Sequence, residues 1–392
     1  MKILSVNAGS SSLKFQLYNM PEKEALISGN FERIGIGQSF YTLKVNGEKI
    51  KKEKELNNHA EAFETLVNEL IENKVVSSLD EIKGIGHRVV QGGDLFDKTV
   101  VIDDEVLEKI DGLSSLAPLH NPAAVVGIKA AKEVFKNATL TAVFDTAFHQ
   151  TMPKENYLYA LPYSWYEDYK VRRYGAHGTS HKFVSIRMNE ILGRTDTKLI
   201  TCHIGNGASI SAVLNGKCIN TSMGLTPNAG LIMGTRSGDI DASIIPYIMD
   251  KTNMSTKDID NAINKESGLL AISRKSSDSR DIEDGIAAGD ENCILAQKMY
   301  VRRIVDYIAK YYVELGGADA IVFTAGIGEK AIDTRRDVIN ELGALGIYLD
   351  EEANNVRSKE TLISTKDSKT ECWVIPTDEE LMIAEDTYEL VK

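Results

Sequence analysis

The chain has 392 residues, 43% of them hydrophobic, which is enough to bury two sizeable cores and predicts two or three domains. Its 45 Lys and Arg against 57 Asp and Glu give a net charge of −12, which excludes general binding to nucleic acid or to an anionic membrane. The sequence has neither a secretory leader pattern nor an apolar run approaching about 18 residues, so we expect a cytoplasmic protein without membrane association.

Helical and strand patterns alternate along the chain, which predicts a mixed α/β fold. Residues 59–74 and 294–315 have the spacing of amphipathic helices, and His59 is expected to be a solvated residue on the first of them. Short β-rich runs are predicted at 85–90, 140–144, 199–203, 320–324 and 372–375. Each run ends in Gly, Asp, Asn or Pro, at the strand ends where α/β folds bind ligands.

Two segments that lie half the chain length apart have the same predicted order of strand, turn and strand. ILSVNAGSSSLKFQLYN and LITCHIGNGASISAVLNGK each read as an apolar strand, a turn rich in small and polar residues, and a second strand. Asn7 aligns with His203 and Gly9 with Gly205, at a common offset of 196 residues. This favours two copies of one domain, with two unrelated glycine-rich hairpins as the alternative.

Three turns have the composition of phosphate-binding loops, because glycine allows close approach and consecutive backbone N–H groups bind anions. The first carries Asn7, Gly9, Ser10, Ser11, Ser12 and Lys14, the second Gly205, Asn206 and Gly207, and the third is TAGIGEK at 324–330. Each lies at a predicted strand end, which favours a nucleotide. The chain lacks a GxxxxGK[ST] loop and a complete dinucleotide fingerprint.

Histidines gather in the middle third of the chain, each beside a turn signal. These six residues are His87, His120, His149, His177, His181 and His203. Their placement predicts a shared active site. A metal site is the competing interpretation, but HGTSH lacks the glutamate that a zinc-binding helix of the HExxH type carries between its histidines.

Charged residues at turns complete the candidate site. Arg88 and Arg236 suit a small acid or a phosphoryl group in transit, since a guanidinium matches their geometry; surface salt bridges are the alternative. Asp145 and Glu379 follow predicted strands and are candidate Mg²⁺ ligands, direct or through water. The alternatives for that role are Asp94, Asp378 and Glu380.

These motifs together resemble the acetate kinase family. VNAGSSSLK at 6–14 and YGAHGTSHKFV at 174–184 are similar to its two signatures, and further matches follow along the whole chain at HRVV, APLHNP, FDTAFH, HIGNGAS, TSMGLTP, MGTRSGDID, SSDSRDI, FTAGIGE and IPTDEE. The resemblance implies an α/β fold of duplicated actin-like ATPase (ribonuclease H-like) domains around a central cleft. It divides the chain into an N-terminal domain, 1–148 plus 381–392, and a nucleotide-binding domain, 149–380.

The implied activity is a kinase reaction: reversible in-line phosphoryl transfer from ATP to the carboxylate of acetate, giving acetyl phosphate and ADP. Mg²⁺ is the implied metal, with Mn²⁺ as a substitute, and the implied assembly is a homodimer. The alternatives are a propionate or butyrate kinase on the same scaffold and, in a different class, a non-metabolic actin-like ATPase.

The resemblance also implies residue roles. Catalysis is assigned to Arg88, Asp145, His177 and Arg236 with His120 in support, and the metal to Asn7 and Glu379. The acyl group is expected to contact Arg88 and walls formed by Val90, Leu119, Ala176 and Pro227. The nucleotide and its phosphates are expected to contact Ser10, Ser12, Lys14, His203, Asn206, Gly207, Asp278, Ser279, Arg280, Gly326, Ile327, Gly328 and Arg335.

Two departures from the family pattern carry predictions. Ala176 stands where a Phe that borders the acetate methyl group is common, so we expect a larger acyl pocket and better use of propionate or butyrate, unless another side chain fills the space. Lys330 replaces the usual Asn of the third turn and is expected to add a phosphate contact.

Overall fold

The computed structural model describes residues 1–118 and 120–392. The chain forms two compact units, Met1–Phe148 with Asp378–Lys392, and His149–Thr377. The first unit therefore resumes at Asp378, slightly before the predicted residue 381. The reason is local: the Asp378 side chain caps α14 (Glu379–Val391) by accepting from the backbone N–H of Leu381 at 2.9 Å, and the Tyr18 hydroxyl of the first unit donates to it at 3.1 Å.

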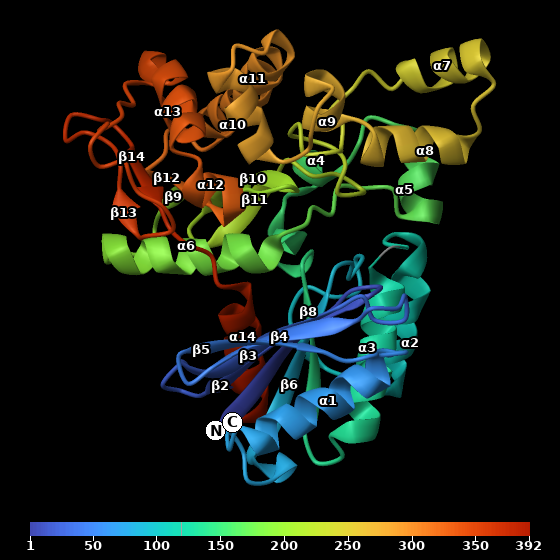
Figure 1. The fold of residues 1–392 in the computed structure, drawn as a ribbon. Helices are drawn as coiled ribbons and strands as arrows, with labels where there is room; N and C mark the ends of the chain where they lie inside the picture. Colours follow the sequence, from blue (N-terminus) through green and yellow to red (C-terminus); the bar gives the residue numbers. More distant parts are fainter. Residues whose placement is uncertain (119) are drawn as a thin grey trace. The chain divides into compact units, whose positions relative to one another are not determined.

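The first unit is built on an eight-stranded sheet of order β5-β4-β3-β2-β1-β6-β8-β7 (Figure 1). Its strands are β1 (Lys2–Ala8), β2 (Ser12–Asn19), β3 (Glu24–Glu32), β4 (Phe40–Val45), β5 (Glu48–Glu53), β6 (Ile82–Val89), β7 (Val100–Val101) and β8 (Thr139–Phe144). Strands β1 to β5 form antiparallel hairpins, whereas β1, β6 and β8 are parallel. The carboxyl ends of these three parallel strands consequently lie at one edge of the sheet.

Alternation along the strands separates the two faces of this sheet. Leu4 of β1 packs in the core that includes Phe63 of α1 (His59–Glu72), and α2 (Asp104–Gly112) and α3 (Asn121–Val134) lie in the same layer. Ile3 packs instead on Ala384 of α14. A Cβ at Gly86 would collide with Thr387 of α14, so this glycine permits the close approach of helix and strand.

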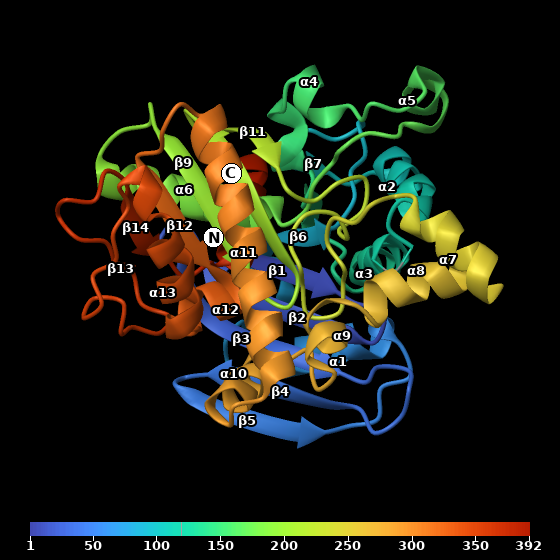
Figure 2. The ribbon, with the colours of Figure 1, turned by 90° about the horizontal axis from the view of Figure 1, so that it is seen from above.

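The second unit is built on a six-stranded sheet of order β11-β10-β9-β12-β14-β13. Its strands are β9 (Lys198–Ile204), β10 (Ala208–Leu214), β11 (Lys217–Thr221), β12 (Ala320–Thr324), β13 (Thr361–Leu362) and β14 (Glu371–Val374). Helices α6 (Gly178–Leu192) and α11 (Glu291–Glu314) cover opposite faces of it in Figure 1, and Figure 2 shows α11 lying over β9 and β10. The remaining helices are α4 (Lys154–Tyr157), α5 (Tyr163–Tyr169), α7 (Ile244–Thr252), α8 (Thr256–Lys265), α9 (Gly268–Ser273), α10 (Ser279–Ala287), α12 (Ala325–Lys330) and α13 (Ile332–Glu341).

The two sheets repeat one topology. The strand order β3-β2-β1-β6-β8 recurs as β11-β10-β9-β12-β14 with the same parallel and antiparallel senses. Lys2 and Lys198 open the first strand of each copy, at the predicted offset of 196 residues. The second hairpin turn is one residue shorter, since Ala8 pairs with Leu13 but Ile204 pairs with Ala208. The agreement extends beyond the hairpins to the parallel strands, which confirms a duplicated α/β fold.

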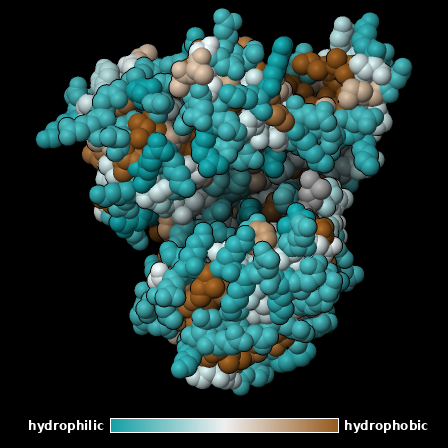
Figure 3. Space-filling model, viewed as in Figure 1, coloured by the Kyte–Doolittle hydropathy of each residue, from teal (hydrophilic) through white to brown (hydrophobic). Residues whose placement is uncertain are grey.

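Both predicted helices are present as α1 and α11, and all five predicted strand runs coincide with strands. Helix α11 begins at Glu291, before the predicted residue 294, because the Asp290 side chain caps it. Among the described residues no helix has the length and apolar character needed to cross a membrane. On the face seen in Figure 3, hydrophilic residues predominate and hydrophobic residues form small separate areas.

Candidate active site

The first hairpin turn of the first unit is held by a histidine from α1. His59 Nε2 lies 2.8 Å from the carbonyl oxygen of Gly9 and 3.3 Å from that of Ser12, and the residue is only 7% exposed. The prediction that His59 is solvated is therefore wrong. Its spacing to Phe63, Leu66 and Leu70 places it on the buried stripe of the helix, which is the sequence signal that identifies it.

An arginine and a carboxylate are paired at the edge of the first sheet. Arg88 Nε donates to Asp145 Oδ1 at 3.0 Å, and Nη2 donates to Oδ2 at 2.6 Å. Burial opposes the charge on the Arg88 guanidinium, but the adjacent Asp145 carboxylate outweighs it and raises the pKa of Arg88 above its usual value. The parallel pairing of β6 with β8 brings these two residues together. This geometry fixes a cationic fork at the strand ends.

Glu379, the first residue of α14, has a buried oxygen without a partner. Its Oε1 forms no hydrogen bond with any described residue, and burial raises the pKa of the carboxyl to about 7. A buried carboxylate is stable when a cation compensates it. Among the alternatives, Glu380 pairs with Lys14 at 2.5 Å and Asp378 accepts from Tyr18 and Leu381, so neither has the unpartnered buried oxygen of Glu379.

The donors present fit a hard cation such as Mg²⁺ better than a zinc-type metal. Within residues 1–118 and 120–392 no group of three or more His, Cys, Asp or Glu is arranged to hold a metal. Mg²⁺ needs no such cage, because it keeps several waters and takes one or two protein oxygens besides phosphate. The orphaned oxygen of Glu379 is a donor of that kind.

A cavity of about 300 Å³ in the first unit gathers most of the residues predicted there. Its lining consists of Asn7, Ala8, Gly9, Ser12, Lys14, Asn30, Arg88, Val90, His120 and Ala124. Ser10 is exposed in the hairpin turn and does not line it. The predicted wall residue Leu119 lies outside the described residues. The structure therefore brings Asn7, Ser12, Lys14 and Arg88 together around this cavity, whereas Glu379 is not among the residues that line it.

In the second unit, four histidines form a cluster beside the second hairpin: His149, His177, His181 and His203. The rings of His177 and His203 stack with centroids 4.1 Å apart, and His181 lies 5.7 Å from His149 and 6.1 Å from His203. His177 has a left-handed backbone, φ 57°, at the position that begins α6. Hydroxyl groups of Ser180, Thr201 and Ser209 bond to the cluster, so these rings are arranged by hydrogen bonds and stacking.

The second hairpin turn lies against an arginine and a histidine. A Cβ on Gly207 would be 3.4 Å from Arg236 Nη1 and 3.5 Å from His177 Nε2, so both side chains flank this glycine. Arg236 Nη1 donates to the carbonyl oxygen of Pro227 at 3.2 Å. No carboxylate among the described residues forms an ion pair with Arg236, and burial lowers its pKa. The Arg236 guanidinium beside this turn therefore has N–H donors that no carboxylate of the described residues engages.

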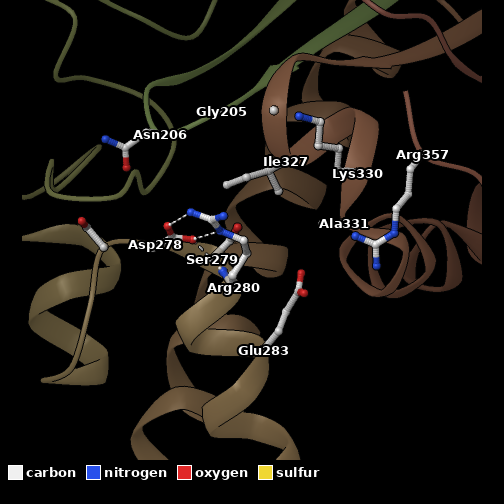
Figure 4. A pocket seen from close by; sticks show the side chains of 12 residues that line it. Gly205, Asn206, Asp278, Ser279, Arg280, Glu283, Ile327, Lys330, Ala331 and Arg357 are labelled. Carbon is white, nitrogen blue, oxygen red and sulfur yellow. Dashed lines mark hydrogen bonds and ion pairs between the residues drawn. The ribbon is translucent and has the colours of Figure 1, made fainter. Parts of the chain in front are cut away.

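A second cavity, of about 510 Å³, opens beside the same turn (Figure 4). It is lined by Gly205, Asn206, Ser277, Asp278, Ser279, Arg280, Glu283, Gly326, Ile327, Lys330, Ala331 and Arg357. Asp278 caps α10 and pairs with Arg280, whose Nη2 is 2.6 Å from Oδ2. Figure 4 shows Lys330 and Arg357 on the side of the cavity away from Asp278. The structure joins the second predicted turn and the segment 324–330 in one cavity. The prediction of a third turn is wrong, because Thr324 ends β12 and Ala325–Lys330 form α12 directly after it.

The sequence missed four lining residues, Ser277, Glu283, Ala331 and Arg357, and misassigned one other residue. Glu283 lies one helical turn after Ser279 on α10, so this spacing could have identified it as a lining residue. No pattern in the sequence identifies Arg357 as one. Arg335 is fully buried and does not line the cavity. Its guanidinium donates to the carbonyl oxygens of Gly328, Asn354 and Val356, at 2.9, 2.9 and 2.8 Å. The predicted nucleotide contact of Arg335 is corrected to a structural role, in which its guanidinium ties α12 to the segment 354–356.

Several other predicted residues are buried around these cavities. Gly328 is buried in α12 and does not line the 510 Å³ cavity. Ala176 is 3% exposed in the core that includes Met223 and Met233, and its carbonyl oxygen accepts from His149 Nε2 at 2.8 Å. His203 is 8% exposed and belongs to the histidine cluster. It does not line the 510 Å³ cavity.

Comparison with known proteins identifies close relatives over the whole chain. A model of the Acetokinase family matches residues 2–385. The acetate kinase of Bacillus subtilis (strain 168) is 52% identical over 393 residues, which is 100% of both chains. Among solved structures, acetate kinase of Porphyromonas gingivalis matches with a TM-score of 0.95 at 44% identity over 100% of both chains. A propionate kinase from Francisella tularensis matches with a TM-score of 0.94 at 44% identity over 99% of both chains.

Proposed function

The chain belongs to the acetokinase family, and from this premise we propose that it is a phosphotransferase acting on acetate. The reaction is reversible transfer of the γ-phosphoryl group of ATP to a carboxylate oxygen of acetate, which forms acetyl phosphate and ADP. A P–O bond to the acetate oxygen forms as the P–O bond to ADP breaks.

The observation that carries this proposal is the position of Arg236 Nη1 and His177 Nε2 together beside Gly207, at 3.4 and 3.5 Å from where its Cβ would lie. Transfer of a phosphoryl group places developing charge on its equatorial oxygens, and donors arranged beforehand around it lower the barrier. A guanidinium without a carboxylate partner and an imidazole nitrogen, both beside a phosphate-type turn, supply such donors. A protein that only binds and releases nucleotide needs the turn but not this pair.

The acceptor is assigned to Arg88. A carboxylate is already nucleophilic at neutral pH, so no general base is required, and the difficulty is to bring two anions together. Asp145 engages Nε and Nη2 of Arg88, which fixes the plane of the guanidinium and leaves Nη1 for an anionic substrate. Asp145 is therefore assigned a positioning role.

The metal is assigned to Glu379 and Asn7, with Mg²⁺ as the expected ion and Mn²⁺ as a substitute. A bound Mg²⁺ neutralises charge on the phosphate oxygens during transfer. The support is the orphaned Glu379 oxygen and the position of Asn7 in the lining of the same unit's cavity.

The nucleotide is assigned to the 510 Å³ cavity. Asp278, Arg280 and Glu283 offer polar groups to a base or ribose, and the backbone of Gly205 and Gly326 allows close approach of phosphates. Lys330, at the end of α12, supplies a charge to the cavity lining, and its contact with a phosphate stays a prediction.

Propionate is the second candidate acceptor, which two observations favour: the similarity to a propionate kinase and the small side chain at Ala176. The homodimer stays a prediction from the resemblance, and the cytoplasmic location stays a prediction from the sequence. The exposed apolar side chains of Trp165 and Tyr169 on α5 and Tyr247 on α7 support an association surface on the second unit.

A hydroxylamine trap for acyl phosphate tests the function. Protein with ATP, Mg²⁺ and acetate should form acetyl hydroxamate, and Arg236→Ala should reduce turnover about 1,000-fold while the Kd for ADP changes less than about threefold. Arg187→Ala is the matched control, because Arg187 is an exposed arginine paired with Glu360. ATP hydrolysis without acyl phosphate would favour the non-metabolic ATPase, and normal synthesis by the Arg236 variant would refute its assignment.

A further inference from the structure

A buried serine joins two histidines of the second unit. Ser209, on β10, is inaccessible to solvent, and its Oγ lies 2.8 Å from His177 Nδ1 and 2.8 Å from His181 Nε2. His181 Nδ1 in turn lies 2.7 Å from Thr201 Oγ1 on β9. Thr201, His181, Ser209 and His177 therefore form one continuous chain of hydrogen bonds, which runs from the sheet to the residue beside the second hairpin turn.

The number of protons available to this chain of hydrogen bonds is limited. Each hydroxyl carries one proton, and a neutral imidazole carries one on its two ring nitrogens. Burial, with the neighbouring imidazoles of His149 and His203, holds the pKa of His181 well below its usual value, so His181 is neutral. It therefore donates from one nitrogen and accepts at the other. Two orientations of the hydrogen bonds between Thr201 and His177 satisfy this requirement and also give the buried Ser209 proton an acceptor.

Thr201 selects between the two orientations. Its hydroxyl is fully buried, and among the described residues its one hydrogen-bond partner is His181 Nδ1. If Thr201 donates, then His181 Nε2–H donates to Ser209 and the Ser209 hydroxyl donates to His177 Nδ1. If the chain runs the other way, the proton of Thr201 is buried without an acceptor, which is unfavourable. The first orientation uses every proton.

We propose that Ser209 is a positioning residue that fixes the tautomer of His177: its hydroxyl donates to Nδ1, so the imidazole carries its proton on Nε2. That nitrogen is the one beside Gly207 and Arg236. An Nε2–H donates to a phosphoryl oxygen, whereas a bare Nε2 would present a lone pair to it. The consequence for catalysis rests on the function proposed above, in which His177 donates to the phosphoryl group in transit.

Two substitutions interrupt this chain of hydrogen bonds at different points. Ser209→Ala removes the hydroxyl that donates to His177. Thr201→Val removes the hydroxyl that sets the direction of the hydrogen bonds, with little change in side-chain shape. Ser211→Ala is the matched control: Ser211 is also fully buried two residues along β10, but its hydroxyl bonds to Thr221 rather than to a histidine.

The kinetic test compares acetyl hydroxamate formation by the three variants. We expect Ser209→Ala to lower kcat about 10-fold or more with less than about a twofold change in KM for ATP, since the lost interaction acts in the transition state. Thr201→Val should lower kcat in the same direction by a smaller factor, and Ser211→Ala should stay within about twofold of the original enzyme. Equal losses in Ser209→Ala and Ser211→Ala would overturn the proposal.

The tautomer is measured directly by nitrogen NMR on protein labelled with ¹⁵N-histidine. The His177 signals are assigned by their absence in His177→Gln. We expect a protonated Nε2 and an unprotonated Nδ1 in the unmodified protein, and a mixture of tautomers in Ser209→Ala. A protonated Nδ1 at neutral pH in the unmodified protein would overturn the proposal whether or not the variants fold. This readout needs no turnover, so it separates failure of the tautomer proposal from failure of the proposed function.

Discussion

Asp145 binds Arg88 through both carboxylate oxygens, at 3.0 Å to Nε and 2.6 Å to Nη2, and is itself 1% exposed. A bidentate pair fixes the direction of a guanidinium as well as its charge. We expect Asp145→Asn to lower kcat for acetyl phosphate synthesis about 100-fold, because the fork loses its fixed plane, and to leave the Kd for ADP nearly unchanged.

The matched control is Glu360→Gln. Glu360 accepts from Arg187 Nε and Nη2 in the same bidentate manner, at 2.7 and 2.9 Å, but the pair is exposed. Its loss should alter kcat by less than about twofold. Equal effects of the two substitutions would contradict a positioning role for Asp145.

Glu379→Gln separates metal binding from stability. Removal of the charge should raise the Mg²⁺ concentration for half-maximal activity about 10-fold or more, as measured at saturating ATP. The Tm of the protein in metal-free buffer should not fall, since a buried carboxylate oxygen without a partner contributes no stability. Glu385→Gln, on the same helix but in an ion pair with Lys23, is the control and should leave the metal requirement unchanged.

His59→Phe should loosen the first hairpin turn. The substitution keeps a buried ring on α1 but removes the hydrogen bond to the carbonyl oxygen of Gly9. We expect faster hydrogen exchange of the turn amides and a kcat reduced about 10-fold, with a loss of stability of about 1 kcal/mol. Unchanged exchange at Ser10 to Lys14 would show that His59 does not hold the turn.

His87 predicts acid sensitivity of the first unit. Burial lowers its pKa to about 3, and its Nε2 has no hydrogen-bond partner among the described residues. The unfolded chain binds a proton near pH 6.5 and the folded chain does not, so stability is complete above about pH 6.5 and falls as the pH drops toward 3.

A His87→Leu variant should lack this pH-dependent contribution to the free energy of unfolding. Between pH 6.5 and pH 5 the free energy of unfolding should fall by about 2 kcal/mol more in the original protein than in the variant, as measured by urea denaturation. Parallel pH dependence of the two proteins would contradict a neutral buried His87.

The acyl specificity depends on what occupies the space beside Ala176. With the small side chain we expect kcat/KM for propionate within about 10-fold of that for acetate, and Ala176→Phe should widen the ratio by about another 10-fold. The measurement is hydroxamate formation with acetate, propionate and butyrate at equal ionic strength. A steep fall from acetate to propionate in the original protein would indicate that another side chain, such as Met223 or Met233 of the same core, fills the space.

Much of the fold follows from local sequence. The alternation of strand and helix patterns and the offset between Asn7 and His203 were sufficient to predict two copies of an α/β domain, because periodicity and turn composition are properties of neighbouring residues. The same information located Arg88, Asp145 and the glycine turns at strand ends, where parallel topology gathers them.

The tertiary structure decided which of those residues have partners. The residue pattern left Asp378 and Glu380 as alternatives to Glu379, which the family resemblance selected. The packing of α14 shows the physical difference, because only Glu379 among the three has a buried oxygen without a partner. It placed His59 in solvent and Arg335 beside a nucleotide, although both are buried against backbone carbonyls. Hydrogen-bond partners and desolvation depend on segments that are distant in the chain, and for that reason they are determined only when the chain has folded.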